Sequence, residues 1–152
     1  MPTQRLSVVV TRRLPERVEA RMSELFDVTL GPRDRPMTRA ELADAMRTAD
    51  VLVPNLRDRI DNTLVAQSGA NLRLIANYGA GVDHIDVATC RQRGILVSNT
   101  PSVVTEDTAD MTMALILAVT RRIPEGLALM RSNDFDGWSP NALLGGRIAG
   151  RR

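Results

Sequence analysis

Residues 72–97 of this chain read LRLIANYGAGVDHIDVATCRQRGILV. The stretch begins with an apolar run at 72–76, which is typical of a buried strand. A loop with two glycines follows, and Asp86 is a suitable N-cap for a helix through residue 93. Gly94 ends that helix, and residues 95–97 form another apolar run. Parallel strands need a crossover, and a helix supplies it, so the stretch predicts a β-α-β unit.

The same alternation extends toward the N-terminus. Three more runs of strand length precede the unit, at residues 6–10, 26–30 and 51–53. Helix starts separate them, marked by Pro15, by a capping box of Thr38 with Glu41, and by Asp61. Five short strands that alternate with helices predict an α/β fold built on a doubly wound parallel sheet with right-handed crossovers.

A different kind of segment follows residue 100. A helix is expected from Ser102 or Thr105 to about Arg122, and a shorter one follows Pro124. The apolar residues of the first helix occupy more than one face, and such a helix is normally buried on nearly all sides. One small sheet cannot cover it, so we expect a further partner: another domain, a second subunit, or both.

Composition narrows the function classes. The chain has 152 residues, 43% of them hydrophobic and 25% charged, which is typical of a folded domain with its own core. All 20 basic residues are arginines scattered among 18 acids, the net charge is +2, and aromatic residues make up 3%. Nucleic-acid binding, which needs a one-sided basic surface, is therefore not expected.

Membrane and disulfide classes are not expected either. The longest apolar stretch, residues 111–119, is far shorter than the roughly 20 residues that span a bilayer. The N-terminus shows no secretory leader pattern. Cys90 is the only cysteine, so neither a disulfide framework nor a cysteine zinc cluster is predicted, and we expect a cytoplasmic protein.

Ligands of open parallel sheets bind beyond the carboxyl ends of the strands, so the loops there are the places to compare. The loop after the first strand, Thr11-Arg12-Arg13, has neither a phosphate-cradling cluster nor an acidic pair. Neither an FMN site nor a phosphorelay receiver is therefore expected.

The loop at residues 77–86 is the best candidate site. Gly79 and Gly81 permit positive φ and close backbone approach, and a helix N-terminus is expected to follow at once. Free backbone N–H groups there suit a carboxylate; the alternative is that the glycines merely form a tight turn. The loop is not a dinucleotide fingerprint, because His84 occupies the place of the third glycine.

Two reactive residue types near this loop have structural interpretations. His84 is the only histidine and lies between two aspartates, so a structural hydrogen bond is favoured over acid–base catalysis. Cys90 has no neighbour in sequence that would activate it, and it is predicted to be a small core residue.

Three linked motifs, in this order, resemble the N-terminal half of the D-isomer-specific 2-hydroxyacid dehydrogenases. They are NYGAGVDHID at 77–86, GILVSNTP at 94–101 and VTEDTAD at 104–110. The resemblance is strongest to glyoxylate/hydroxypyruvate reductases and covers nearly the whole chain. It implies an NAD(P)-dependent oxidoreductase that acts on a small 2-oxo or 2-hydroxy acid.

The resemblance also implies a domain plan. Residues 1–100 would form the N-terminal portion of a flavodoxin-like substrate domain with a five-stranded sheet. Residues 101–152 would be linker helices that lead into a missing NAD(P)-binding Rossmann domain. The helix from Thr105 to Arg122 would form the contact of a homodimer.

Site residues follow from the resemblance in the same way. The backbone N–H groups of Ala80 and Gly81 would hold the substrate carboxylate, and Leu56 would form a wall of the pocket. Thr105 would lie near the nicotinamide of NAD or NADP. Trp138 would reach a substrate pocket across the dimer, or else act as a packing anchor in its own turn-rich segment. The catalytic Arg, Glu and His of the family correspond to positions beyond residue 152, so no catalytic residue is assigned here.

Two functions therefore stand beside each other. The first is a truncated N-terminal portion of a reductase, inactive alone. The alternative is a non-catalytic, dehydrogenase-derived module that binds a partner or a small acid through its exposed apolar helix.

Overall fold

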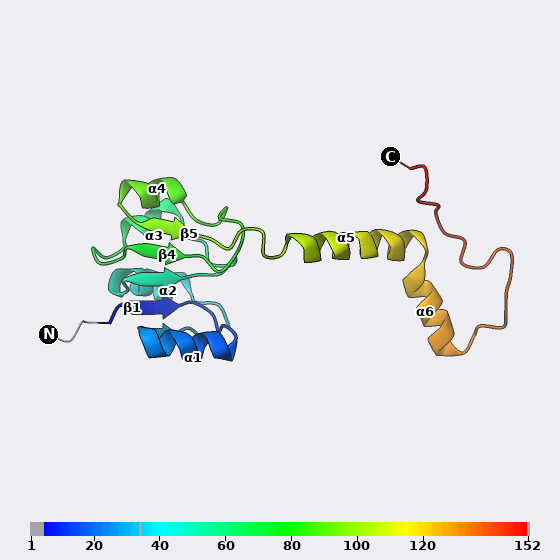
Figure 1. Cartoon of the computed structure of the whole chain (residues 1–152), viewed down its shortest axis with the longest axis horizontal. Coiled ribbons are helices and arrows are strands. Elements are labelled where there is room, and N and C mark those ends of the chain that lie inside the picture. The colour runs from blue at the N-terminus through cyan, green and yellow to red at the C-terminus, as the bar shows by residue number, and fades with distance from the viewer. Residues whose placement is uncertain (1–4, 34, 152) are drawn as a thin grey trace. The chain divides into compact units, whose positions relative to one another are not determined.

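The computed structural model describes residues 5–33 and 35–151, and the chain divides into two compact units (Figure 1). The first unit is Met1–Val103 and the second is Val104–Arg152. Each unit is a contiguous piece of the chain, and each is described by itself.

The first unit is a five-stranded parallel sheet with four helices. Its elements in chain order are β1 (Ser7–Val10), α1 (Glu16–Leu25), β2 (Asp27–Leu30), α2 (Arg39–Thr48), β3 (Val51–Val53), α3 (Asn62–Ala66), β4 (Leu74–Ala76), α4 (Val87–Gln92) and β5 (Leu96–Ser98). The strand order is β2-β1-β3-β4-β5, and every neighbouring pair is parallel. This is the flavodoxin-like order, so the predicted fold is confirmed. The order reverses direction at β1 and β3.

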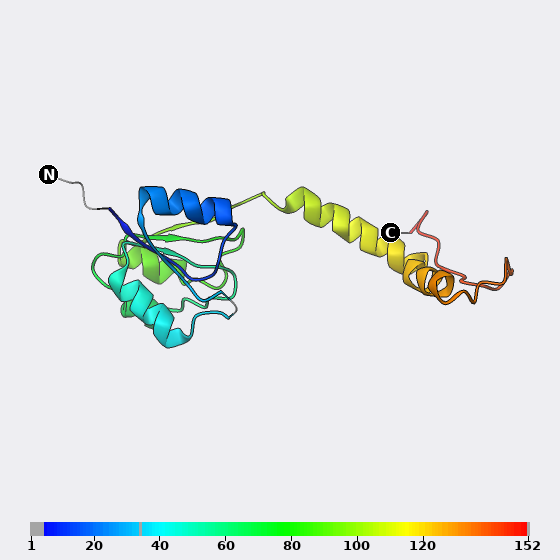
Figure 2. The same ribbon diagram turned by 90° about the horizontal axis from the view of Figure 1, so that it is seen from below.

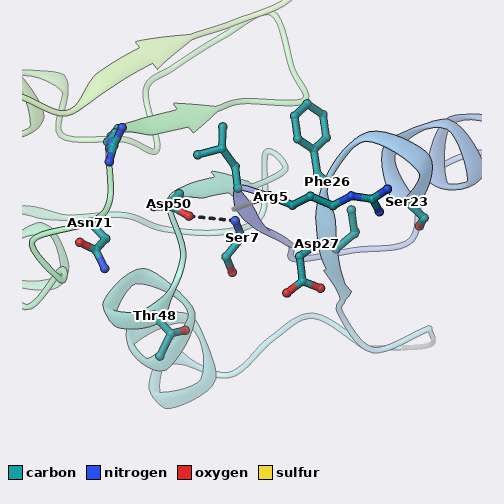
Figure 3. Close-up of a pocket in the computed structure, with 11 residues that line it drawn as sticks. Arg5, Ser7, Ser23, Phe26, Asp27, Thr48, Asp50 and Asn71 are labelled. Carbon is teal, nitrogen blue, oxygen red and sulfur yellow. Dashed lines mark hydrogen bonds between the residues drawn. The ribbon is translucent and has the colours of Figure 1, made fainter. Parts of the chain in front are cut away.

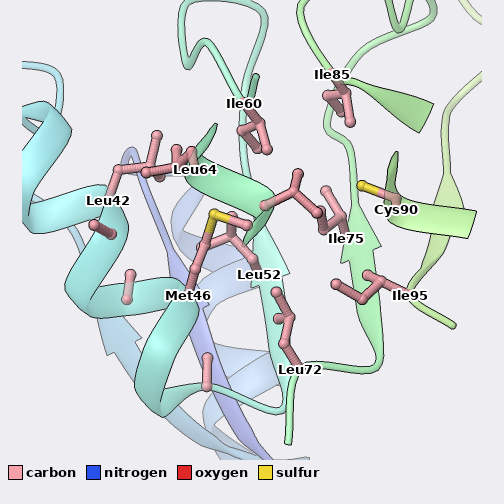
Figure 4. Close-up of a cluster of buried hydrophobic side chains, with 14 of the residues drawn as sticks. Leu42, Met46, Leu52, Ile60, Leu64, Leu72, Ile75, Ile85, Cys90 and Ile95 are labelled. Carbon is pink, nitrogen blue, oxygen red and sulfur yellow. The ribbon is translucent and has the colours of Figure 1, made fainter. Parts of the chain in front are cut away.

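The strand register assigns one face of the sheet to a single core. Val9 pairs with Leu52, and Leu52 pairs with Ile75, so these side chains share a face. Helices α2, α3 and α4 supply the other half of the cluster, with Met46 fully buried among them. Figure 4 shows these side chains meeting between the helices and the sheet. Burying each large side chain of this kind stabilises the fold by about 1.5–3 kcal/mol.

The opposite face of the sheet is covered unevenly. Helix α1 lies on this side, across the sheet from α2 (Figure 2), and Val8 and Val10 of β1 are buried. At the β5 end, Leu96 has 70% of its surface exposed. This face is therefore closed near β1 and open near β5.

The helix starts follow the predicted caps. Thr38 accepts a hydrogen bond from the Glu41 amide, and the Glu41 carboxylate accepts one from the Thr38 amide, which completes a capping box. Asp61 caps α3 through the Leu64 amide. Gly94 ends the α4 turn with φ of 73°, a conformation that favours glycine. Four strands begin later than predicted, β1, β2 and β5 by one residue and β4 by two, and β5 also ends one residue later. Leu72 and Ile95, which precede β4 and β5, are buried in the core without joining a strand.

The second unit contains α5 (Thr105–Thr120) and α6 (Ile123–Ser132), which contact each other. Ser102 has φ of 65°, so the first of the two predicted helix starts is wrong, and the helix begins at Thr105. Arg122 has φ of 53°, which separates α5 from α6. Neither helix contains a buried residue. Among the residues described, no helix is long and apolar enough to cross a bilayer.

Candidate functional site

Two loops leave the carboxyl edge of the sheet side by side, one after β3 and one after β4. Short bridges join them beyond the strands, Asn55 with Tyr78 and Ile60 with Ile85. The Ile60 amide donates to the His84 carbonyl at 2.8 Å, and the Asp86 amide donates to the Ile60 carbonyl at 2.8 Å. The loops are therefore held to each other by backbone hydrogen bonds, and the residues they carry have a fixed relation.

Leu56 and Gly79 meet where these loops run together. A Cβ atom added to Gly79 would overlap the end of the Leu56 side chain, so a larger residue there would require the exposed Leu56 side chain to move. Leu56 remains 59% exposed, which leaves an apolar surface beside the loop at residues 77–86, called the glycine loop below. The structure thus places the predicted site residue Leu56 against Gly79, the residue that precedes Ala80.

The expected reason for the glycines was partly wrong. Neither Gly79 nor Gly81 has positive φ, because space rather than backbone handedness is limiting at Gly79. At Gly81 the nearest atom to an added Cβ is a carboxylate oxygen of Asp83 at 3.7 Å, so a side chain would fit.

The helix N-terminus that was expected directly after the glycines is also not there. Helix α4 begins at Val87, after residues 82–86, and the Asp86 carboxylate already accepts from the Thr89 amide at 2.9 Å. Any anion at this edge would therefore be bound by the amides of the loop, because the helix start has its own cap.

The carbonyl groups of Gly79, Ala80 and Gly81 are all engaged. Asn77, which is 2% exposed, donates through Nδ2 to the Gly79 carbonyl at 3.1 Å and to the Gly81 carbonyl at 2.8 Å. The Ala80 carbonyl accepts from Asn99 Nδ2 at 2.7 Å. Within the described part of the chain, the N–H groups of Ala80 and Gly81 donate to no protein acceptor. Both residues are exposed, so two donors face solvent beside Leu56.

His84 has the structural hydrogen bond that was predicted. Its Nε2 lies 3.1 Å from Oδ1 of Asn77. Burial lowers the pKa of His84, and the nearby carboxylates of Asp58 and Asp83 oppose that shift. Cys90 is fully buried, and burial raises the pKa of its thiol, which agrees with the predicted core role.

A buried polar cluster lies at the carboxyl ends of β1 and β3, and sequence reasoning did not identify it. The Asp58 carboxylate, 3% exposed, accepts from the Thr11 hydroxyl and from the Asn55 amide and side-chain Nδ2, both at 2.9 Å. The cluster fixes the start of the loop that carries Leu56. The available signal was the set of short polar residues directly after two buried strands.

An ion pair between Arg13 and Glu19 lies at the same carboxyl edge of the sheet. The Glu19 carboxylate, which is almost fully buried, accepts from the Arg13 guanidinium and from the Leu14 amide at 2.7 Å. The hydrogen bond from Arg13 holds the pKa of Glu19 at about 2. Glu19 therefore ties the loop after β1 to helix α1.

The remaining predicted residues belong to the second unit. Thr105 is the first residue of α5, and Trp138 is 85% exposed. This exposure shows that Trp138 is not a packing anchor within its own segment. The roles of Thr105 beside the nicotinamide and of Trp138 beside the substrate stay predictions.

The residues present do not fit a dinucleotide or a metal. A pyrophosphate is normally held where a strand leads through a glycine-rich turn straight into a helix. In the described part of this chain the glycine loop after β4 is separated from α4 by five residues, 82–86. No cluster of three metal-ligating side chains is found among the described residues.

The amino edge of the sheet holds a cavity of about 900 Å³ (Figure 3). Its polar groups include Arg5, Asp27 and Asp50, and the Asp50 carboxylate already accepts from the Ser7 amide at 2.8 Å. It lies at the end of the strands opposite to the glycine loop. Ligands of such sheets bind at the carboxyl edge, so we assign the candidate site to the glycine loop in spite of the size of this cavity.

Comparisons with known proteins agree with this geometry. A profile of the D-isomer specific 2-hydroxyacid dehydrogenase catalytic domain matches residues 8–143. The glyoxylate reductase of Thermococcus kodakarensis is 38% identical over 151 residues, which cover 97% of this chain and 45% of that protein. The chain therefore spans a little under half the length of the curated relatives it matches.

Solved structures give the same result. The TT0316 protein of Thermus thermophilus has a TM-score of 0.82 and 42% identity, with 93% of this chain and 45% of that chain covered. An NADPH-dependent glyoxylate/hydroxypyruvate reductase from Sinorhizobium meliloti, solved with NADP and malonate, has a TM-score of 0.76 and 28% identity. The match covers 97% of this chain and 44% of the Sinorhizobium meliloti chain.

Proposed function

Because this chain belongs to the D-isomer specific 2-hydroxyacid dehydrogenase family, we propose that its first unit binds the carboxylate of a small 2-oxo or 2-hydroxy acid. The observation that carries the proposal is the pair of free, exposed N–H groups at Ala80 and Gly81. They lie on a loop whose Gly79, Ala80 and Gly81 carbonyls all accept from protein donors.

The chemistry of this surface suits a small carboxylate. Two adjacent amides can each donate to one carboxylate oxygen, and hydrogen bonds to an ionised acceptor are about twice as strong as neutral ones. Leu56 offers an apolar surface next to them, which suits the short carbon chain of the acid. We assign none of the described residues to hydride or proton transfer, and we propose that the part of this chain in a reaction is to hold and orient the acid.

For the whole protein we propose the activity of an NAD- or NADP-dependent 2-hydroxyacid oxidoreductase of the glyoxylate/hydroxypyruvate reductase type. The support is the identity to glyoxylate reductases over 95% or more of this chain. The described residues do not fit a dinucleotide, so cofactor binding belongs to the sequence that corresponds to the rest of those relatives. We expect the 152-residue chain alone to be inactive as a reductase and the protein to be cytoplasmic.

We further propose that the chain forms a homodimer through the helix from Thr105 to Arg122. The support is the exposure of its apolar residues, which include Met111 at 60%, Leu115 at 57% and Val119 at 72%. Apolar surface of this extent on one helix is typical of an interface. In such a dimer Thr105 would approach the nicotinamide and Trp138 a substrate pocket.

The carboxylate proposal is tested with ¹⁵N-labelled chain and glycolate. We expect the amide signals of Ala80 and Gly81 to shift on titration, with a Kd on the order of millimolar, since only a few atoms of ligand are held. Chloride at equal ionic strength is the control. Shifts that are absent, or that are matched by chloride, would contradict the proposal. A parallel assay for glyoxylate-dependent oxidation of NADPH or NADH should show no turnover; turnover would contradict the expected inactivity.

The alternative, a non-catalytic interaction module, is favoured by the same exposed helix. Size-exclusion chromatography with light scattering, together with the glycolate titration, separates a partner-binding module from the substrate-binding portion of a reductase, because both would form a defined oligomer. A defined oligomer that does not shift with glycolate favours the module, whereas glycolate binding favours the substrate-binding portion of a reductase.

A further inference from the structure

The direction of an amide N–H in this loop is set by the carbonyl that precedes it. In a trans peptide the C=O and N–H point in opposite directions across one rigid plane, and no cis peptide is found among the described residues. The group that holds the Gly79 carbonyl therefore directs the Ala80 N–H, and the group that holds the Ala80 carbonyl directs the Gly81 N–H.

Two asparagine side chains occupy those holding positions. Nδ2 of Asn77 donates to the Gly79 carbonyl at 3.1 Å, together with the Thr100 amide at 3.0 Å, and Nδ2 of Asn99 holds the Ala80 carbonyl. Asn99 acts on one peptide plane, and Asn77 acts on two, those that follow Gly79 and Gly81. The Ala80 N–H is thus turned away from Asn77, and the Gly81 N–H is turned away from Asn99.

The amide orientation of Asn77 is fixed by its partners. Its nitrogen faces two carbonyl oxygens, those of Gly79 and Gly81, and a flipped amide would place oxygen against both. Oδ1 must then face His84, and only a protonated Nε2 can donate to it. His84 therefore carries its proton on Nε2 in the neutral state, and it keeps that donor when the ring is charged.

We propose that Asn77 and Asn99 are positioning residues that aim the Ala80 and Gly81 amides at the substrate carboxylate, with His84 holding Asn77 through Nε2–H. The inference rests on the proposed function, because it assigns which groups set the orientation of the proposed carboxylate donors. None of the three touches the carboxylate; each acts through a carbonyl or through another side chain.

The His84 tautomer is tested on the unmodified chain. The ¹⁵N shifts of the imidazole ring, measured above the pKa of His84, should show a protonated Nε2 and an unprotonated Nδ1. A ring protonated on Nδ1 would overturn the assignment of His84, and this result does not depend on whether glycolate binds.

The asparagines are tested by uncharged substitutions with a matched control. Asn99→Ala should weaken glycolate binding by about tenfold or more, the usual loss for one hydrogen bond to a charged group. Residual dipolar couplings should show a reoriented Gly81 N–H with the Ala80 N–H little changed. Asn77→Leu should act mainly on the Ala80 N–H, and by less than Asn99→Ala acts on the Gly81 N–H, because the Thr100 amide still holds the Gly79 carbonyl. Asn71→Ala, at an exposed position near the amino edge of the sheet, should leave Kd and both couplings unchanged.

Substitution of His84 completes the test. His84→Leu should weaken binding, and His84→Gln, which keeps an N–H donor on a side chain of similar reach, should restore it. If the unmodified chain does not bind glycolate, the proposed function fails. If it binds and the asparagine variants bind equally well with unchanged couplings, the carboxylate site stands and the positioning inference is wrong.

Discussion

The two units of this chain treat apolar side chains in opposite ways. In the first unit the register of the strands and three helices bury residues such as Met46, Leu52 and Ile75 completely. In the second unit α5 is richer in apolar residues than α1 or α2 of the first unit, yet none of its side chains is buried. The first unit therefore carries most of the free energy of folding, whereas α5 presents surface whose burial requires a partner.

The helix ends differ in the same direction. Thr38, Asp61 and Asp86 cap α2, α3 and α4 with side-chain hydrogen bonds. The N-caps of α5 and α6, Val104 and Arg122, make no such bond. Three of the four helices of the first unit thus start at a side-chain cap, with α1 after Pro15 as the exception, whereas neither helix of the second unit does.

The largest expected difference concerns core truncation. Leu52→Ala should reduce the free energy of unfolding by about 2–5 kcal/mol, because a fully buried leucine leaves a cavity. Leu115→Ala, at a residue that is 57% exposed, should change it by less than about 0.5 kcal/mol. Urea denaturation followed by far-UV circular dichroism measures both. Equal losses would show that α5 is packed as tightly as the core.

The next prediction addresses what covers α5. Ile116→Glu should weaken self-association at least about tenfold, or 1.4 kcal/mol, because it places a charge in the proposed interface. Gln92→Glu, which adds the same charge to exposed α4 in the first unit, is the control. Sedimentation equilibrium gives both association constants. If the two variants associate alike, α5 is not the contact between copies.

Capping should give a smaller effect of opposite sign in the two units. Thr38→Ala should lower the stability of the first unit by about 1 kcal/mol, because it removes the capping box. Val104→Ser should stabilise α5 by up to about 1 kcal/mol, because it adds a cap where none exists. Amide hydrogen exchange along each helix is the measurement. A Val104→Ser variant with unchanged exchange in α5 would show that its start is set by tertiary contacts.

The last prediction concerns acid, and it has no effect at neutral pH. The pKa values of Glu19, Glu41 and Asp61 are about 2 in the folded chain, chiefly because arginine side chains donate to them, against ordinary values of 4.5, 4.5 and 3.8. Since the folded pKa is lowered, the stabilisation is present above about pH 4.5 and is lost as pH falls toward 2. All three lie in the first unit.

Urea denaturation at a series of pH values checks this. Glu19→Gln should flatten the acid-dependent loss in that window, and Glu16→Gln, at an exposed position on the same helix, should not. A Glu19→Gln variant with the full acid loss would show that the ion pair with Arg13 contributes nothing to it.

Sequence predicted the parts of the fold that local chemistry decides. Caps, helix-ending glycines and strand-length apolar runs act over a few residues, so Thr38, Asp61, Asp86 and Gly94 were identified correctly. The flavodoxin-like strand order came from the family resemblance, because periodicity alone does not decide which strands are neighbours.

The candidate site was predicted less completely for a physical reason. The close contact of Gly79 is with Leu56, which is 23 positions earlier in the chain and reaches it only through the joined loops. The cluster of Thr11, Asn55 and Asp58 likewise forms only when two strands lie side by side. Hydrogen bonds over such separations leave no periodic signal in one sequence.

Burial of the single thiol makes the modification rate of Cys90 a measure of how often the first unit opens. Cys90 has no exposed surface in the folded first unit, and the second unit contains no cysteine. A thiol reagent can react only when α4 lifts from the sheet, so the rate of modification counts openings of the first unit and ignores motions of the second. Binding of a small acid to the neighbouring loop should lower the rate of Cys90 modification, and the size of the decrease would report how strongly the loop and the core open together.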